Sequence, residues 1–124
     1  MQFIKLITSL YDTYIYRDAS NEEMTILGHF LASDARYDPS SFIEYALNDW
    51  EQYTSSNLTA LEKENGYILL TDLYSEEKIP TVLKMTQEQF IQILTDWKEK
   101  VCKLKPKEVI IKYENDQFII ETKN

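Results

Sequence analysis

Cysteine, histidine, glycine and proline are all scarce in this sequence. Its 124 residues include one cysteine (Cys102), one histidine (His29), two glycines and three prolines. A lone cysteine cannot form an internal disulfide, whereas most small secreted domains depend on disulfides, so we expect a reducing, cytoplasmic location. The shortage of glycine and proline disfavours an all-β sandwich with many tight turns and favours helices. The length predicts a single domain over residues 1–124.

Long apolar runs and an excess of positive charge are also missing. No stretch approaches the roughly eighteen apolar residues of a membrane span, and the first residues lack the basic region of a secretory signal, so we expect no membrane association. The net charge is −8, and residues 1–80 hold 14 acidic and 5 basic residues. This balance disfavours direct binding to nucleic acid. An acidic surface suits a basic protein partner; the alternative interpretation is that the acidity serves solubility alone.

Apolar periodicity predicts two helices at the start of the chain. Apolar side chains recur every three or four residues from Phe3 to Tyr14, which predicts a helix over residues 3–16. A second helix is expected over residues 21–35. Ser20 would cap it, and Glu23 would complete the capping box. Gly28 lies on its apolar face, where it would allow another element to approach closely.

A third helix is expected over residues 42–53. Ser41 and Glu44 form a possible capping box at its start. Its expected buried face has four apolar members: Ile43, Ala46, Leu47 and Trp50. Glu44, Asn48 and Glu51 would occupy the opposite, polar face.

The remainder of the chain alternates between strand and helix signals. Residues 58–64 and 67–74 flank Asn65-Gly66, a strong signal for a hairpin because both turn positions need a positive φ. Further strands are expected over residues 81–85, 109–113 and 117–121. A helix over residues 87–104 would begin with a Thr86–Gln89 capping box and bury a stripe that includes Trp97. The predicted fold is α+β: N-terminal helices plus a mainly antiparallel sheet of about five strands, covered by a C-terminal helix.

The residue types that carry catalysis or bind metals are thinly represented. His29 has no evident nucleophile to activate, and Cys102 has no evident base. No Cys/His pair has ligand spacing, no EF-hand loop occurs, and no glycine-rich phosphate loop is present. We therefore expect a protein that is not an enzyme, with no catalytic residues, no cofactor and no bound metal.

Tyrosines and carboxylates occur close together in the first two-thirds of the chain. Tyrosine offers a large contact area at a small entropic cost and keeps its hydroxyl hydrated. A neighbouring carboxylate would attract Lys and Arg on a partner. The candidate partner-binding residues lie on the third expected helix and in the loop after residue 71: Glu44, Tyr45, Asp49, Glu51, Asp72, Tyr74, Glu76 and Glu77.

Three segments in the second half resemble immunity proteins of bacterial contact-dependent growth-inhibition and polymorphic-toxin systems, of the type paired with ribonuclease toxins. These segments are the strand Tyr67 to Tyr74, the stretch Met85 to Trp97, and Lys105 to Lys112 before a final hairpin. The resemblance implies an inhibitor that binds a toxin domain and usually masks its active site. It is structural, so it assigns no functional residue.

Two functions follow as hypotheses. The first is an immunity protein that binds and neutralises a cognate, basic nuclease toxin through an acidic surface. The second is an acidic regulatory or adaptor protein, or an inhibitor that mimics nucleic acid, unrelated to toxin immunity. A toxin gene directly upstream would favour the first.

Overall fold

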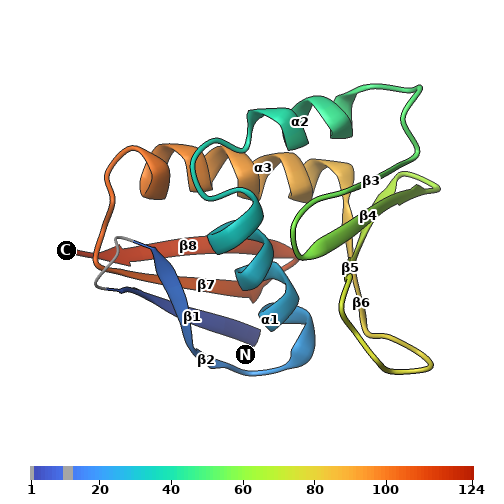
Figure 1. Cartoon of the computed structure of the whole chain (residues 1–124). Helices are drawn as coiled ribbons and strands as arrows, with labels where there is room; N and C mark the ends of the chain where they lie inside the picture. Colours follow the sequence, from blue (N-terminus) through green and yellow to red (C-terminus); the bar gives the residue numbers. More distant parts are fainter. Residues whose placement is uncertain (1, 10–12) are drawn as a thin grey trace.

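The computed structural model describes residues 2–9 and 13–124, which form two antiparallel four-stranded sheets and three helices (Figure 1). Two of the helices continue into a short π-helical turn. In chain order the elements are β1 (Gln2–Thr8), β2 (Tyr14–Ala19), α1 (Glu22–His29) with η1 (Phe30–Asp34), α2 (Ser40–Leu47), β3 (Tyr53–Ser55), β4 (Thr59–Glu64), β5 (Tyr67–Asp72), β6 (Val82–Thr86), α3 (Gln87–Trp97) with η2 (Lys98–Cys102), β7 (Glu108–Glu114) and β8 (Gln117–Lys123).

The strands are divided between two sheets. Sheet A has the order β2-β1-β7-β8, and sheet B has the order β3-β4-β5-β6. Every pairing is antiparallel. The class α+β is therefore correct, but the expected single sheet of about five strands is wrong, because three strands were missed and the eight strands form two sheets.

The expected helix over residues 3–16 is wrong. The described parts of this segment form β1 and β2, and residues 10–12 of the expected helix lie outside the described residues. In β1 the buried side chains alternate, with Ile4 and Leu6 fully buried, which is the period of a strand. Ile4 and Leu6 pair with Ile111 and Val109 of β7, near the other end of the chain. This long-range pairing overrides the helical spacing of the local apolar residues.

The next two helices differ from expectation at their ends. Asn21, and not Ser20, caps α1, where its side chain accepts a hydrogen bond from the Met24 N–H at 2.9 Å. Ser20 instead accepts a hydrogen bond from the Phe3 N–H at 2.8 Å. Helix α2 starts at Ser40 without a side-chain N-cap and ends at Leu47, well before residue 53.

The shortened α2 changes the face that is buried. Tyr45 and Ala46 are buried, whereas Leu47 is 62% exposed. Trp50 lies beyond the helix and is 80% exposed, so its expected place in the core is wrong. Asn48 ends the helix by leaving the helical region, and this turn directs the following residues away from the core.

Local signals in the second half of the chain are confirmed. Asn65 and Gly66 both have positive φ in the β4–β5 hairpin. Thr86 and Gln89 form both hydrogen bonds of the capping box that begins α3. The stripe of α3 and η2 is buried through Trp97 and Val101, but Leu104 lies past η2 and is 71% exposed.

One hydrophobic core joins the two sheets. Helix α1 contacts β1 and β2 of sheet A and β5 and β6 of sheet B, and α3 contacts strands of both sheets as well. A β-carbon at Gly28 would lie 2.2 Å from Ile4 Cδ1, so the glycine permits the close approach of α1 to β1. Among the described residues, no helix is both long enough and apolar enough to cross a membrane.

Candidate protein-binding surface

One face of sheet B is left uncovered. Along its strands, buried side chains such as Leu61, Leu70 and Leu83 alternate with exposed or half-buried ones. The helices lie on the buried side (Figure 1). We call the other side the open face, which consists of Tyr53, Ser55, Ala60, Glu62, Glu64, Tyr67, Leu69, Thr71, Val82 and Lys84.

The open face combines apolar and charged side chains in cross-strand rows. Tyr53, Glu62, Leu69 and Lys84 are successive partners across the four strands. Tyr53 is 57% exposed, and Lys84 Nζ lies 4.2 Å from the centroid of the Tyr67 ring. Cross-strand neighbours on one face lie close enough to act together, so this row presents a continuous contact area.

Hydrogen bonds hold the loop between α2 and β3 near one end of the open face. Asn48 Oδ1 accepts hydrogen bonds from the Glu51 N–H at 2.9 Å and from Lys63 Nζ at 3.2 Å. Lys63 also donates to the Asn48 carbonyl oxygen at 2.7 Å. These bonds hold the loop so that Asp49 and Trp50 remain exposed.

Tyr45 supports this loop from inside. Its ring is buried, its hydroxyl donates to the Gln52 carbonyl oxygen at 3.0 Å, and Lys63 Nζ lies 4.5 Å from the ring centroid. Burial, together with the nearby Glu51 and Glu62 carboxylates, raises the pKa of Tyr45 to about 12. Tyr45 was a candidate contact residue, but its burial gives it a supporting position and leaves it no surface to offer a partner.

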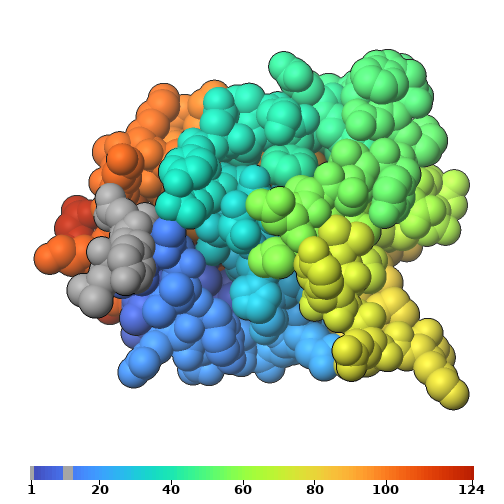
Figure 2. Space-filling view, viewed as in Figure 1, coloured from blue at the N-terminus to red at the C-terminus, as the bar shows by residue number. Residues whose placement is uncertain are grey.

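The opposite end of sheet B carries the second group of candidates. Asp72 ends β5, and the loop that follows stands out from the lower right of the molecule, in yellow (Figure 2). Tyr74 in this loop is 71% exposed, and Glu76 and Glu77 are exposed as well. A pocket of about 280 Å³ lies beside the loop. Four carboxylates are among the residues that line it: Glu22, Asp72, Glu76 and Glu77.

The predicted site residues therefore occupy two ends of one sheet. Asp49 and Glu51 lie near the β4–β5 hairpin, while Asp72, Tyr74, Glu76 and Glu77 lie at the other end. Glu44 is exposed on α2. The sequence did not identify the open face between them, including Glu62 and Glu64. Alternation in residues 58–64 indicated a half-exposed strand, but only the fold reveals that the exposed side remains uncovered.

Residues 44–79 concentrate both charge and exposed apolar surface. They contain eight acidic and two basic residues, a net charge of −6, whereas the rest of the chain contains thirteen acidic and eleven basic residues. Among the described residues, seven of the twelve exposed large apolar side chains lie in this segment. They are Leu47, Trp50, Tyr53, Tyr67, Leu73, Tyr74 and Ile79.

The described residues also form few groupings suited to catalysis. His29 is exposed and faces the Tyr16 ring edge-on, with ring centroids 6.2 Å apart. Burial, with a further effect of Asp38, raises the pKa of the Cys102 thiol, which keeps it protonated and poorly nucleophilic. Within residues 2–9 and 13–124, no three His, Cys, Asp or Glu side chains are placed to share a metal ion.

Comparison with known proteins gives no further assignment. No family model matches the chain, and neither the curated proteins nor the solved structures include a significant match.

Proposed function

We propose that this protein is an immunity protein that binds a basic toxin domain, a nuclease and most specifically a ribonuclease, and neutralises it by covering its active site. The proposal assigns the binding to the open face of sheet B together with the acidic residues at its two ends. It requires no catalytic step by the protein itself.

The observation that carries the proposal is the coincidence of charge and apolar exposure in residues 44–79. Protein interfaces combine a desolvated, aromatic-rich centre with a polar rim. Trp50, Tyr53 and Tyr67 offer aromatic area, and exposed tryptophan and tyrosine side chains are frequent hot spots of binding energy. The surrounding carboxylates supply the polar rim.

The sign of the charge points to the class of partner. A nuclease needs Lys and Arg in the groove that binds the phosphates of its substrate. Carboxylates on an inhibitor can engage the same cations and accelerate the encounter. In the described structure, the acidic residues of segment 44–79 form no ion pair within the chain, which leaves them available for a partner.

The acidic pocket beside the β5–β6 loop suits one cationic side chain of such a partner. Its volume of about 280 Å³ accommodates a lysine or arginine side chain, and Asp72, Glu76 and Glu77 lie along its wall. Asp72 is held in place because its Oδ1 accepts a hydrogen bond from the Tyr74 N–H at 2.9 Å. A fixed carboxylate loses less entropy when it binds a cation.

The test is co-expression with the protein encoded directly upstream of this gene. The proposal predicts that the two proteins co-purify as a stable complex, and that the upstream protein degrades RNA only when this chain is withheld. A partner that is harmless and lacks nuclease activity would contradict the toxin-immunity assignment and favour an adaptor role. Failure to form any complex would contradict the proposal as a whole.

A matched control separates the surface from net charge. Glu62→Lys with Glu64→Lys reverses two carboxylates on the open face, and Asp18→Lys with Glu114→Lys reverses two exposed carboxylates of sheet A. Both double variants change the net charge equally. The proposal predicts loss of protection from the first only. Equal loss from both would show that total charge matters and that the open face has no special part.

A further inference from the structure

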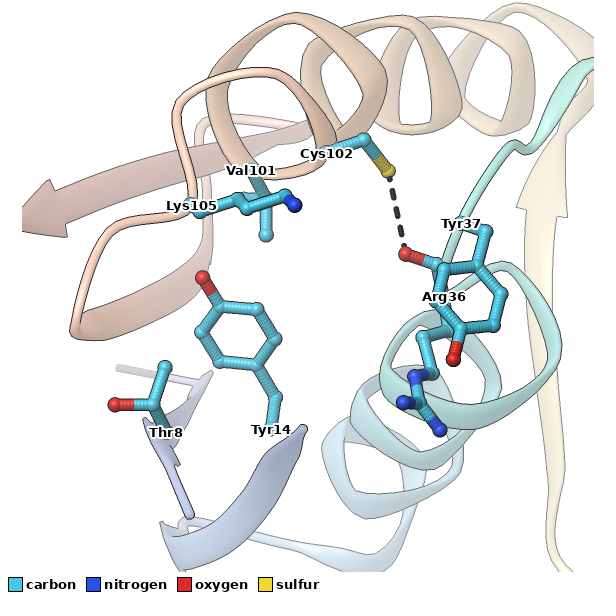
Figure 3. A pocket seen from close by; sticks show the side chains of 7 residues that line it. All are labelled: Thr8, Tyr14, Arg36, Tyr37, Val101, Cys102 and Lys105. Carbon is cyan, nitrogen blue, oxygen red and sulfur yellow. Dashed lines mark hydrogen bonds between the residues drawn. The ribbon is translucent and has the colours of Figure 1, made fainter. Parts of the chain in front are cut away.

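A second cavity lies beside sheet A, and its lining includes no residue of the open face. Its volume is about 500 Å³. Thr8 and Tyr14 come from β1 and β2, Arg36 and Tyr37 follow η1, Val101 and Cys102 belong to η2, and Lys105 follows η2. In Figure 3, Tyr14 and Lys105 lie on one side of this cavity and Arg36 with Tyr37 on the other.

The described lining of this cavity carries positive charge, opposite in sign to the net charge of the chain. Arg36 and Lys105 line it, and none of its seven described lining residues is acidic, although the chain carries 21 acidic residues. Arg36 and Lys105 form no ion pair within residues 2–9 and 13–124. The Cys102 thiol adds no negative charge, because it donates a hydrogen bond to the Arg36 carbonyl oxygen at 3.5 Å and burial keeps it protonated.

Arg36 has an unmet hydrogen-bonding requirement. Its Nε is buried and has no acceptor among the described residues. A buried donor without a partner is unusual in a folded protein, so this N–H is available to an acceptor on a ligand. The guanidinium carbon lies 4.4 Å from the centroid of the Tyr37 ring, so the cation stacks on the ring face. A guanidinium can bind an oxyanion through two parallel N–H donors.

Lys105 is also positioned by the backbone. It has a φ of 48°, in the left-handed region, and its N–H donates to the Val101 carbonyl oxygen at 2.9 Å, which closes the turn after η2. This turn places the Lys105 side chain over the cavity (Figure 3). The Tyr14 hydroxyl donates to the Pro106 carbonyl oxygen, so the wall opposite Arg36 is fixed to the same turn.

We propose that this cavity binds a small organic phosphate. The phosphate group lies between Arg36 and Lys105, which together balance its two negative charges. The cavity is larger than a phosphate ion needs, and the rings of Tyr14 and Tyr37 with Val101 supply apolar walls for a planar organic group. This inference is independent of the proposed immunity function, because it uses residues outside segment 44–79.

Phenyl phosphate is the probe, with inorganic phosphate and benzoate for comparison, and isothermal titration calorimetry on the full chain is the measurement. We expect one site per chain for phenyl phosphate, with weaker binding of inorganic phosphate, which lacks the ring, and of benzoate, which has a single charge. Equal affinity for benzoate would overturn the phosphate assignment. No binding of phenyl phosphate would overturn the proposal.

Variants test the two cations separately. Arg36→Gln and Lys105→Gln should each weaken phenyl phosphate binding by about tenfold or more, as expected when a charge-assisted contact is lost. Arg17→Gln and Lys78→Gln remove the same charges from exposed positions elsewhere and should bind as wild type does. Lys105 is exposed, so Lys105→Gln keeps the test valid even if Arg36→Gln unfolds. Wild-type affinity in Lys105→Gln, or in a folded Arg36→Gln, would overturn the proposal.

Discussion

Segment 44–79, which contains the second half of α2 and most of sheet B, differs from the rest of the molecule in whether its charged side chains form ion pairs. All four ion pairs among the described residues lie outside residues 44–79. In sheet A, Lys5 pairs with Glu108 at 2.8 Å, and Lys112 pairs with Glu121 across the β7–β8 hairpin. Segment 44–79, by contrast, contains eight acidic residues and only two lysines, and neither lysine forms an ion pair within the described structure.

The pKa values of sheet A reflect these pairings. The Lys5 ammonium accounts for the lowered pKa of Glu108, and the Glu121 carboxylate accounts for the raised pKa of Lys112. A carboxylate without such a partner retains its full attraction for an external cation. Charged side chains of sheet A therefore stabilise the fold through ion pairs, whereas the carboxylates of segment 44–79 remain unpaired in the described structure and can attract a cationic partner.

The two tryptophans provide the largest test of this contrast. Trp97 is fully buried, its indole N–H donates to the Ala35 carbonyl oxygen at 3.1 Å, and its ring packs edge-on against Tyr14. Trp97→Ala should lower the free energy of unfolding by about 3–5 kcal/mol, because it leaves a cavity and removes burial. Denaturant unfolding measures this change. An unchanged midpoint would contradict the assignment of Trp97 to the core.

Trp50→Ala should have the opposite profile. With 80% of its surface already exposed, Trp50 contributes little to folding, so stability should change by less than about 0.5 kcal/mol. Binding to the upstream-encoded partner should weaken by about 2 kcal/mol, as for an interface hot spot. A thermal melt and a binding titration separate the two effects. Unaltered affinity would remove Trp50 from the proposed surface.

Much of the second half of the chain was predictable because its signals are local. The Asn65-Gly66 turn and the Thr86–Gln89 capping box specify structure within a few residues. β1 was missed because its partner β7 is remote in sequence, and helical spacing occurs by chance among closely spaced apolar residues. Asp72 and Glu76 are candidate binding residues that the sequence suggests through the local concentration of carboxylates and tyrosines. Tyr45 was expected at the surface because the buried face of α2 was predicted wrongly.

Tyr45 offers a pH test of the support beneath the loop. Its folded pKa of about 12 lies above the usual value of 10.0, so its contribution to stability is complete below pH 10 and is lost as the pH rises toward 12. Wild type should lose on the order of 1–2 kcal/mol from this group over that range. Tyr45→Phe should lose less over the same range. Parallel pH profiles of unfolding free energy for the two proteins would contradict this account.

The smallest expected effects concern the residues of classical catalytic type. His29→Ala and Cys102→Ala should leave partner binding and protection unchanged, because neither residue lies on the proposed surface and burial keeps the Cys102 thiol protonated. A protection assay against the upstream-encoded protein measures this. Loss of protection in a well-folded His29→Ala variant would indicate a functional role that the proposal lacks.

Association kinetics test the central claim most directly. Two triple variants reverse the two groups of acidic candidates, those on α2 and the loop after it (Glu44, Asp49 and Glu51 to Lys) and those at the far end of sheet B (Asp72, Glu76 and Glu77 to Lys). The account predicts that each variant folds, that its association rate with the partner falls sharply at low salt, and that the deficit shrinks at high salt, as for electrostatic steering. If both variants associate as fast as wild type at low salt, the acidic surface serves solubility alone and the proposed binding surface is wrong.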